Sequence, residues 1–588
     1  MNTEKQHKIN KQLIIKRIFP TLVVAFLMPF IICLSIPFEV YAGNLSEFLF
    51  TASNMLPMLL LFTFGFTAII FLFLLFMPPK AYRVLCAMII AFGFLFFLQG
   101  TYLNGSYSSL AGDNLANSTP STFMFIFNLL IWVVVVAGAV VLALFKDKIK
   151  DKFGIIPIVA YVITAVIFAT QTISPLTSII TNDQVFMTIN ERLEASGLEQ
   201  EHEILTKEYL KGISTSNNIY YFCIDRFDET YAEDALEKYP NIFDNLTGFT
   251  WFQDHTSLYG HTYPAVATML TNKEYDSSVL RNDHLNSIYN EENTLSLLAN
   301  NGYQINLHTQ NHYAFTDAAY FPEYVQNAKI AENFDLKSPF LLAWNMIKLA
   351  CYRVSPLLGK LLYLDVNSNS CNAYVEEFDA DNNAKYSVDM KEVYNFVNTS
   401  EVNQTNNKLF NFIHLEGCHG VSYNENWKRA TLASEDITVS VKCSFMIIDK
   451  YIEAMKATGV YDNATIIITG DHGAAPPTVG EIKKPTRTAL FVKLSNSTND
   501  KLKTSQAQTS HDNIWATILK SENIINDDSY GKSVFEIEEG VDQTRRYILH
   551  TYYKDLDEYF YEIKGTARDL KNWKVVRTNH YENRFIMD

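Results

Sequence analysis

Two segments of the chain place carboxylate and imidazole side chains directly after short apolar runs. Asp225 follows the run 218–224, and Asp471 and His472 follow the run 464–469 within a Gly-Asp-His-Gly turn. Carboxylate and imidazole groups are ligands that suit Zn²⁺ or Mn²⁺. We therefore expect a metal site if the fold brings these side chains together. The alternative is that each Asp only caps the element that follows it.

A threonine at position 262 stands where a helix is expected to begin. Gly260 precedes it, Pro264 follows it by two residues, and the apolar run 265–270 continues from there. The N-terminus of a helix favours an anion through its free N–H groups and its dipole. Thr262 is therefore a candidate nucleophile whose hydroxyl a metal would activate. The alternative is an ordinary helix cap.

These candidate residues need a sheet whose strands end side by side. Four short apolar runs bounded by polar turns are typical of buried strands, and they span 218–224, 408–413, 464–469 and 488–492. Helical stretches such as 436–458 lie between them. The alternation predicts an α/β sandwich with a central, mostly parallel sheet and a site at the carboxyl ends of its strands.

Charge divides the chain into two unlike parts. The 588 residues carry a net charge of −15, yet residues 1–175 hold 11 basic and only 6 acidic residues. The acidic excess therefore lies entirely in the remaining chain. This balance argues against nucleic acid as a partner, because phosphate binding needs a basic surface. An acidic part joined to an apolar, basic-flanked part indicates a membrane protein with a water-soluble head.

The first part contains five stretches of about 20 apolar residues, the length at which a helix crosses the hydrocarbon core. These predicted spans are 18–38, 56–77, 84–103, 122–145 and 153–173. We accordingly predict a transmembrane domain over residues 1–175, an amphipathic linker over 176–216 and a catalytic domain over 217–588.

The short loops indicate the orientation. Lys and Arg residues lie in the N-terminal segment, between the second and third spans, and in the loop Lys146–Lys152, whereas loops 39–55 and 104–121 contain none. The positive-inside rule then places the N-terminus in the cytoplasm and the catalytic domain outside. An alternative for the first span is a signal peptide cleaved near Val40–Ala42, which would leave the topology of the other spans unchanged.

Four features resemble the sulfatase-like branch of the alkaline phosphatase superfamily. Asp225 resembles the acidic ligand after the family's first strand, Thr262-x-Pro264 the nucleophile motif, and Thr469–Gly473 the metal-binding motif. The segment His414–Gly420 is similar to the paired-histidine segment of lipid phosphoethanolamine transferases. Together with five membrane helices, these features resemble membrane-bound phosphoethanolamine transferases and lipoteichoic acid synthases most closely.

The resemblance implies a multi-pass enzyme of a bacterial-type plasma membrane. It would transfer phosphoglycerol or phosphoethanolamine from a membrane phospholipid to a surface glycan or lipid acceptor through a phosphothreonine. One Zn²⁺ or Mn²⁺ would be held by four residues: Asp225, Thr262, Asp471 and His472. Three histidines are implied as substrate contacts, His414, His419 and His511, the last of which is also a candidate ligand of a second metal.

The chain also departs from these families. Asp225 stands where the phosphotransferases usually have Glu, Val421 replaces a Pro, and Lys484 lies near the place of a further His of the phosphoethanolamine transferases. These departures leave the head group and the second metal open. A hydrolase of sulfuric esters or phosphodiesters with the same fold is the alternative function, although Thr262 and Val266 do not form the Cys/Ser-x-Pro-x-Arg signature of sulfatases.

Cysteine use fits an external domain without fixing its bridges. Cys351, Cys371, Cys418 and Cys443 could pair as 351–371 and 418–443, one of three connectivities.

Overall fold

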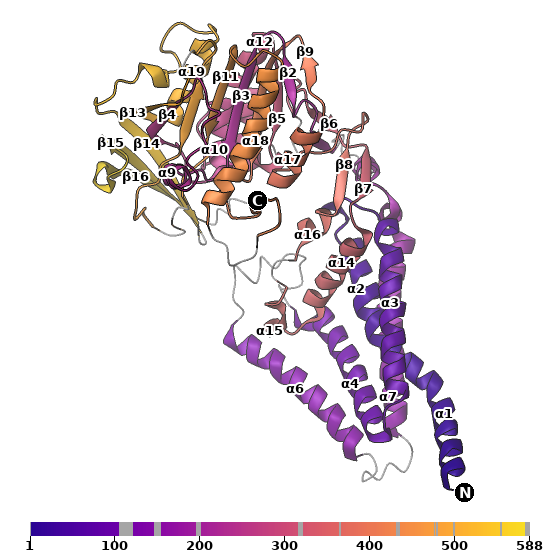
Figure 1. The fold of residues 1–588 in the computed structure, drawn as a ribbon. Helices are drawn as coiled ribbons and strands as arrows, with labels where there is room; N and C mark the ends of the chain where they lie inside the picture. The colour runs from indigo at the N-terminus through magenta and orange to yellow at the C-terminus, as the bar shows by residue number, and fades with distance from the viewer. Residues whose placement is uncertain are drawn as a thin grey trace. The chain divides into compact units, whose positions relative to one another are not determined.

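The protein folds into two compact units, each described here by itself (Figure 1). The first contains Met1–Glu201 and Phe334–Glu377, and the second contains His202–Asn333 and Phe378–Asp588. The structure is a computed structural model. It describes residues 2–104, 121–145, 155–195, 202–314, 321–363, 366–430, 436–474, 477, 480–497, 500–552 and 555–582.

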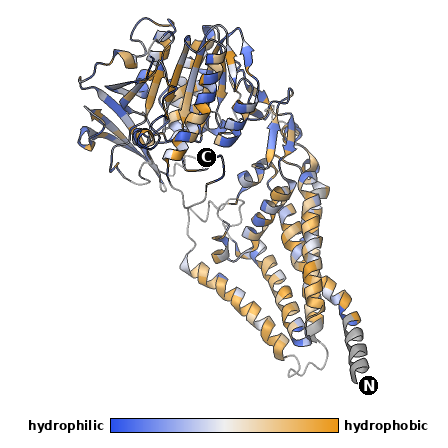
Figure 2. Cartoon of the chain, in the orientation of Figure 1, coloured by the Kyte–Doolittle hydropathy of each residue, from blue (hydrophilic) through white to orange (hydrophobic). Residues whose placement is uncertain are grey.

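Five helices of the first unit are long and apolar enough to cross a membrane, which confirms the predicted number of spans. They run over Ile15–Ala42, Ala52–Leu75, Pro79–Leu103, Thr122–Phe145 and Ile158–Thr177, and Figure 2 shows that they are hydrophobic along most of their length. The predicted basic loop 146–152 and most of loop 104–121 lie outside the described residues.

The spans are built from the longest helices of the chain. They are α1 (Asn2–Phe30) continued by the π-helical turn η1 (Ile31–Ser35) and α2 (Ile36–Ala42), α3 (Ala52–Leu75), α4 (Pro79–Leu98) continued by η3 (Gln99–Leu103), α6 (Thr122–Phe145) and α7 (Ile155–Thr181). Helix α3 begins four residues before the predicted start, because Thr51 and Asn54 form a capping box that hydropathy does not reveal.

The segment Phe334–Glu377 belongs to the first unit, although the parts of the chain on either side of it belong to the second. It holds α14 (Pro339–Val354), α15 (Leu357–Lys360) and α16 (Ser368–Asn372). The expected domain 217–588 is therefore interrupted. The physical reason is that the apolar face of α14 is buried in the hydrophobic core formed by the spans.

The predicted linker 176–216 is also divided. Helix α7 continues to Thr181, and the short helix α8 (Ile189–Ala195) follows it in the first unit. Strands β1 (Glu203–Leu205) and β2 (Gly212–Ser214) belong to the second unit and pair with β6 and β9 there.

The second unit is organised around a seven-stranded sheet with the order β13-β4-β12-β11-β3-β10-β5. Only β12 runs antiparallel to its neighbours, so the predicted α/β fold with a mostly parallel sheet is confirmed. The strands are β3 (Asn218–Ile224), β4 (Thr250–Thr256), β5 (Tyr303–His308), β10 (Lys408–Leu415), β11 (Ala464–Thr469), β12 (Leu490–Lys493) and β13 (Lys503–Ser510).

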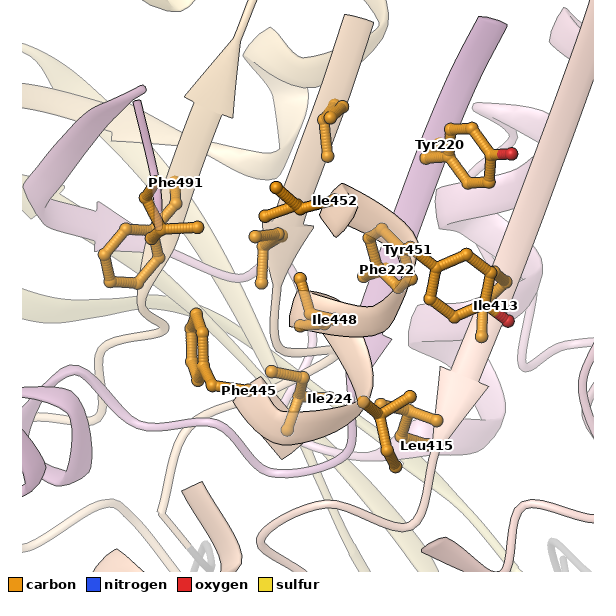
Figure 3. Close-up of a cluster of buried hydrophobic side chains, with 14 of the residues drawn as sticks. Tyr220, Phe222, Ile224, Ile413, Leu415, Phe445, Ile448, Tyr451, Ile452 and Phe491 are labelled. Atoms are coloured by element: carbon orange, nitrogen blue, oxygen red, sulfur yellow. The ribbon is translucent and has the colours of Figure 1, made fainter. Parts of the chain in front are cut away.

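Alternating side chains of the central strand β3 pack into two cores, one on each face of the sheet. Tyr220 and Phe222 belong to the core shown in Figure 3, together with side chains of α18 (Thr438–Ala457). Tyr221 and Cys223 belong to the opposite core, which α10 (Thr262–Thr271) and α19 (Ile514–Ser521) help to form. A strand buried on both faces reads as one continuous apolar run, which is why the sequence identified it.

The other elements of the second unit surround this sheet. The helices are α9 (Glu229–Lys238), α11 (Arg281–Asn290), α12 (Thr294–Asn300), α13 (Asn311–Ala314) and α17 (Met390–Thr399). Its small sheets contain β6 (Ala328–Ile330) and β9 (Asn403–Thr405). A further pair, β7 (Asn333–Leu336) and β8 (Val375–Phe378), lies almost entirely in the first unit.

A three-stranded antiparallel sheet ends the chain, formed by β14 (Thr544–Tyr552), β15 (Leu556–Lys564) and β16 (Trp573–Tyr581). Ile548 of β14 exchanges backbone hydrogen bonds with Leu258 and Gly260, at 2.7 and 3.1 Å. This sheet therefore holds the segment that leads directly into Thr262.

All seven cysteines are free. The considered pairings 351–371 and 418–443 are therefore wrong. Cys371, Cys418 and Cys443 are buried and pack as small apolar side chains, Cys371 in the core of the first unit and the other two in one core of the second.

Candidate functional site

The carboxyl ends of β3 and β11 bring the predicted ligands together. Thr469 lies opposite Cys223 in the sheet, so Asp471 and Asp225 each follow two residues later at the same edge. Ligand atoms of Asp225, Asp471 and His472 lie within 4.8 Å of one another, and all three residues are buried. Among the side chains that the structure describes, this is the one group of His, Cys, Asp and Glu with such spacing.

Backbone groups fix the orientation of Asp471. Its Oδ1 atom accepts hydrogen bonds from the N–H groups of Arg226 at 2.8 Å and His472 at 2.9 Å. Arg226 has a φ of +59°, a left-handed conformation that bulky residues seldom adopt and that is often found at functional sites. With Oδ1 occupied in this way, Oδ2 is buried and has no hydrogen-bond partner among the described residues.

The donor set fits a divalent cation. His472 Nε2 lies 3.9 Å from Asp225 Oδ1 and 3.7 Å from Asp471 Oδ2, and both oxygens are buried without a hydrogen-bond partner in the described part of the chain. The other ring nitrogen of His472 lies 2.8 Å from the Gly473 carbonyl, which can only accept a hydrogen bond. Nε2 therefore carries the lone pair that a metal needs.

Electrostatics lead to the same assignment. Burial raises the pKa of Asp225 well above its usual range, and the neighbouring charge of Asp471 adds to this effect. Burial acts in the same direction on Asp471, but His472, His414 and the Arg226 N–H group favour its charged form, and the net effect is a lowered pKa. Two buried carboxylates that face each other are stabilised by a bound cation.

Thr262 begins helix α10, as the sequence predicts. The preceding His261 has extended backbone angles, so Thr262 is the first residue in helical conformation. The Thr262 side chain lies close enough to Asp471 to contribute to lowering the pKa of that carboxyl. The hydroxyl therefore lies against the carboxylate cluster and at the N-terminal end of a ten-residue helix.

His414, predicted as a substrate contact, lies next to the carboxylate cluster itself. It is part of β10, its Nδ1 lies 3.0 Å from the Thr309 hydroxyl, and its Nε2 lies 3.9 Å from Asp225 Oδ2. Burial lowers the pKa of His414 to about 4, so the ring is neutral at pH 7. A neutral imidazole with a buried Nε2 suits either a metal or a phosphoryl oxygen.

The two other predicted histidines are placed differently. His419 is exposed at the edge of the site, where its carbonyl accepts a hydrogen bond of 3.1 Å from Arg226 Nη1. His511 is buried at the end of β13, and its Nε2 lies 3.1 Å from the Gly470 carbonyl. In this arrangement His511 supports the turn that carries Asp471, and the role of a second-metal ligand stays a prediction.

Tyr313, which the sequence analysis did not single out, also belongs to the site. Its ring centre lies 5.6 Å from that of His414. Burial raises the pKa of Tyr313 to about 12, and the charges of Asp225 and Asp471 contribute. The hydroxyl is thus a neutral donor near the carboxylates. It is separated from the motifs in sequence, so no spacing pattern could indicate it.

A second polar array lies next to the start of α10. The Tyr263 hydroxyl contacts Nδ1 of His550 on β14, and His550 Nε2 lies 3.1 Å from Glu558 Oε1 on β15. The His550 and Glu558 side chains are 1% and 4% exposed, so the pair is sequestered from water. This array joins the residue after Thr262 to the terminal sheet.

We expect Glu558→Gln to destabilise the second unit by about 2–3 kcal/mol at pH 7. Burial would raise the pKa of Glu558, but the neighbouring His550 and Ser277 side chains and a hydrogen bond of 2.9 Å from Asn579 lower it to about 2. Because the folded-state pKa is lowered, this stabilisation is present above about pH 4.3 and is lost as the pH falls toward 2. Denaturant titrations at pH 7 and pH 3.5 should show the difference between the two proteins shrinking at the lower pH.

Glu562→Gln is the matched control, since Glu562 lies on the same strand with its side chain 41% exposed. Equal effects of the two substitutions, or a pH-independent effect at position 558, would contradict this expectation.

Gly417→Ala should weaken both folding and metal binding. Gly417 has a φ of +53°, and a Cβ atom there would lie 2.4 Å from Ile224 Cγ2 and 2.9 Å from the Asp225 backbone nitrogen. We expect about 2–4 kcal/mol of destabilisation and at least a tenfold loss of metal affinity. Gly420→Ala is the control, because a Cβ there meets nothing within 4 Å. Thermal melts and metal titrations of both variants test this, and a Gly417→Ala protein with normal metal affinity would contradict it.

Solved structures similar to this chain have low sequence identity. A phosphonate monoester hydrolase from Silicibacter pomeroyi is 14% identical, with 62% of this chain and 89% of that chain covered and a TM-score of 0.34. A PsFucS1 sulfatase from Pseudoalteromonas sp. is 12% identical, with 61% and 82% covered and a TM-score of 0.37. An alkaline phosphatase superfamily protein from Vibrio parahaemolyticus is 10% identical, with 64% and 85% covered and a TM-score of 0.34. No curated protein sequence matches the chain.

A comparison with protein families gives one match. The sulfatase family model matches residues 217–521, which contain Asp225, Thr262, Asp471 and His472. Members of the superfamily are metal-dependent enzymes that act on sulfate or phosphate esters. The matched region covers more than half of the chain, and the chain therefore belongs to the sulfatase family.

Proposed function

We propose that the protein transfers a phospho-head group, phosphoglycerol or phosphoethanolamine, from a membrane phospholipid to a surface glycan or lipid acceptor. The observation that carries this proposal is the position of Thr262, whose hydroxyl lies at a helix N-terminus against the Asp471 carboxylate. Five apolar helices in the same chain support a substrate from the bilayer.

Four residues would hold one Zn²⁺ or Mn²⁺: Asp225, Thr262, Asp471 and His472. When bound, the cation supplies charge neutralisation and a lowered pKa for the threonine hydroxyl. Thr262 Oγ would attack the phosphorus atom, so that a P–Oγ bond forms and the bond to the diacylglycerol oxygen breaks. The hydroxyl proton leaves with diacylglycerol. An acceptor hydroxyl then attacks the phosphothreonine, transfers its own proton to Thr262 Oγ and regenerates the threonine.

The histidines near the cluster would bind the phosphoryl oxygens. His414 is fixed by Thr309 and presents a buried Nε2, whereas His419 lies at the exposed edge of the site where an acceptor would arrive. The free N–H groups at the start of α10 add further donors for the same oxygens.

Release of diacylglycerol tests the proposal. Full-length protein in nanodiscs of labelled phosphatidylglycerol or phosphatidylethanolamine, with Mn²⁺ or Zn²⁺ added in turn, should release labelled diacylglycerol and leave a labelled, acid-stable phosphothreonine. Absence of both products with both lipids and both metals would overturn it.

Hydrolysis is the second candidate function, and the match to the sulfatase family favours it. Position 262 is nevertheless Thr, and Val266 is fully buried in a hydrophobic core where the signature of sulfatases has Arg. Turnover of an aryl sulfate or a phosphodiester with water as the acceptor, in the absence of lipid, would establish hydrolysis instead.

We also propose that the second unit faces the extracytoplasmic side, since the basic residues lie in alternate loops. Protease added outside intact spheroplasts should then degrade the second unit and spare a tag on the N-terminus. Full protection of the second unit would contradict the orientation.

A further inference from the structure

The most exposed side chains of α14 and α15 in the first unit are apolar. Within residues 339–362, all of which the structure describes, every exposed side chain is hydrophobic. They are Pro339, Phe340, Leu341, Trp344, Leu358, Leu361 and Leu362. Leu362 is 78% exposed. Soluble proteins seldom leave so many neighbouring apolar side chains open to water.

None of the three charged residues of the same stretch is among these exposed side chains, because Lys348 and Arg353 are half-buried and Lys360 is buried. Lys360 is fully buried, and its Nζ donates a hydrogen bond of 2.6 Å to the Tyr352 carbonyl. Arg353 forms an ion pair of 2.6 Å with Glu39 at the end of the first span. A helix in water places its charges outside and its apolar side chains inside. Here the most exposed positions are apolar and Lys360 is buried, which is the order expected for a segment surrounded by lipid.

The segment lies beside the spans at considerable depth. Phe340 and Trp344 pack at a tilt against Phe62 of α3, with ring centres 5.0 and 5.7 Å away. Phe62 is ten residues into α3, about 15 Å along a helix that rises 1.5 Å per residue. That distance is about half of a hydrocarbon core 30 Å thick.

The second helix of the segment is held by another span. The Leu357 N–H group donates a hydrogen bond of 3.1 Å to Asn128 Oδ1, six residues into α6 and thus about 9 Å from its start. Leu357 also packs against Phe125 of α6. The segment therefore contacts α3 and α6 within the length over which both helices are apolar.

We propose that residues 339–362 form a re-entrant element embedded in the hydrocarbon of one leaflet, with phospholipid acyl chains covering the exposed face. We infer that lipid covers this face because it is continuous with the lipid-facing surface of the spans. Leu61 and Phe64 of α3 and Phe127 of α6 are exposed beside the segment, and these positions on a membrane span face lipid. The segment is inserted between Asn333 and Phe378 of the second unit, so that unit is joined to the membrane unit at three points of the chain.

Site-directed spin labelling tests the proposal without reference to catalysis. Cys86 and Cys351, which are partly accessible, are first replaced by Ala. Labels are then introduced by Leu358→Cys and Leu362→Cys in the full chain in nanodiscs. Phe64→Cys is the reference for lipid, and Lys337→Cys, which lies at an exposed position just before the segment, is the reference for water.

For each label we compare its accessibility to O₂, which concentrates in lipid, with its accessibility to a water-soluble nickel chelate. The ratio of the two should be at least fivefold higher for labels at positions 358 and 362 than for the label at position 337. It should be similar to the ratio for the label at position 64. Ratios equal to that at 337 would overturn the proposal. Spin–spin broadening at 362 that disappears on dilution with unlabelled protein would show that a second copy covers this face, and would overturn it too.

Trp344 offers a measurement that needs no label. Lipids brominated on the acyl chain should quench the tryptophan fluorescence of the native chain more than that of the Trp344→Phe variant. Equal quenching of the two proteins would count against embedding.

Discussion

Thr262→Ala is expected to lower turnover by at least 10⁴-fold while the thermal melting of the second unit changes little. The hydroxyl is the group that would form the covalent bond to phosphorus, so its loss removes the reaction step and not only a binding contact. Thr262 is the first residue in helical conformation, and the N-cap position of α10 is occupied by His261, whose side chain makes no capping hydrogen bond. Replacing Thr262 therefore removes no helix cap. Diacylglycerol release and a melt on the same preparation measure the two effects.

Thr230→Ala is the matched control for this substitution. Thr230 also lies in the first turn of a helix and hydrogen-bonds to a carboxylate, Asp228, but it is exposed and outside the ligand group. Its activity should stay within twofold of the native enzyme. A Thr262→Ala protein with near-native turnover, or one that loses about 1 kcal/mol of stability and no activity, would support the capping role instead.

Asp471→Asn is expected to abolish metal binding and therefore to lower the activity by at least 10³-fold. The amide oxygen can still accept the hydrogen bonds that the Arg226 and His472 N–H groups give to Oδ1, so the turn should keep its shape. The substitution removes one of the two buried negative charges that attract the cation, and the repulsion between them no longer needs a cation to offset it. The native protein should melt at a lower temperature after chelation, because bound ligand stabilises the folded state, whereas the variant should not respond.

Metal content measured on purified protein, together with melts in the presence and absence of chelator, decides this prediction. Asp512→Asn is the control, since Asp512 forms a partly exposed ion pair with Arg546 close to His511. It should bind metal as the native protein does. Stoichiometric metal in Asp471→Asn would show that the cluster is not the metal site.

The two-part organisation and three residues of the candidate metal cluster are already indicated by local features of the sequence. Hydropathy is a local property, so about 20 apolar residues indicate a span regardless of the neighbours, and the five spans followed from it. The run 218–224 matches β3 at both ends because a strand buried on both faces leaves a continuous apolar signal. Asp225 stands out because it directly follows such a strand, and Asp471 and His472 because they lie in the turn just after another, β11.

The other residues around this cluster become visible only in the folded chain. Tyr313 and the Tyr263–His550–Glu558 array reach the site from separate elements, and no spacing along the chain encodes a contact between strands and loops so far apart. The sequence indicates His414 as a substrate contact, but its distance of 3.9 Å from Asp225 Oδ2 follows only from the pairing of β10 with β3. The same holds for residues 334–377, which interrupt the second unit. An apolar helix gives one hydropathy signal whether a soluble core or lipid surrounds it, and the difference emerges only when the fold shows which side chains point outward.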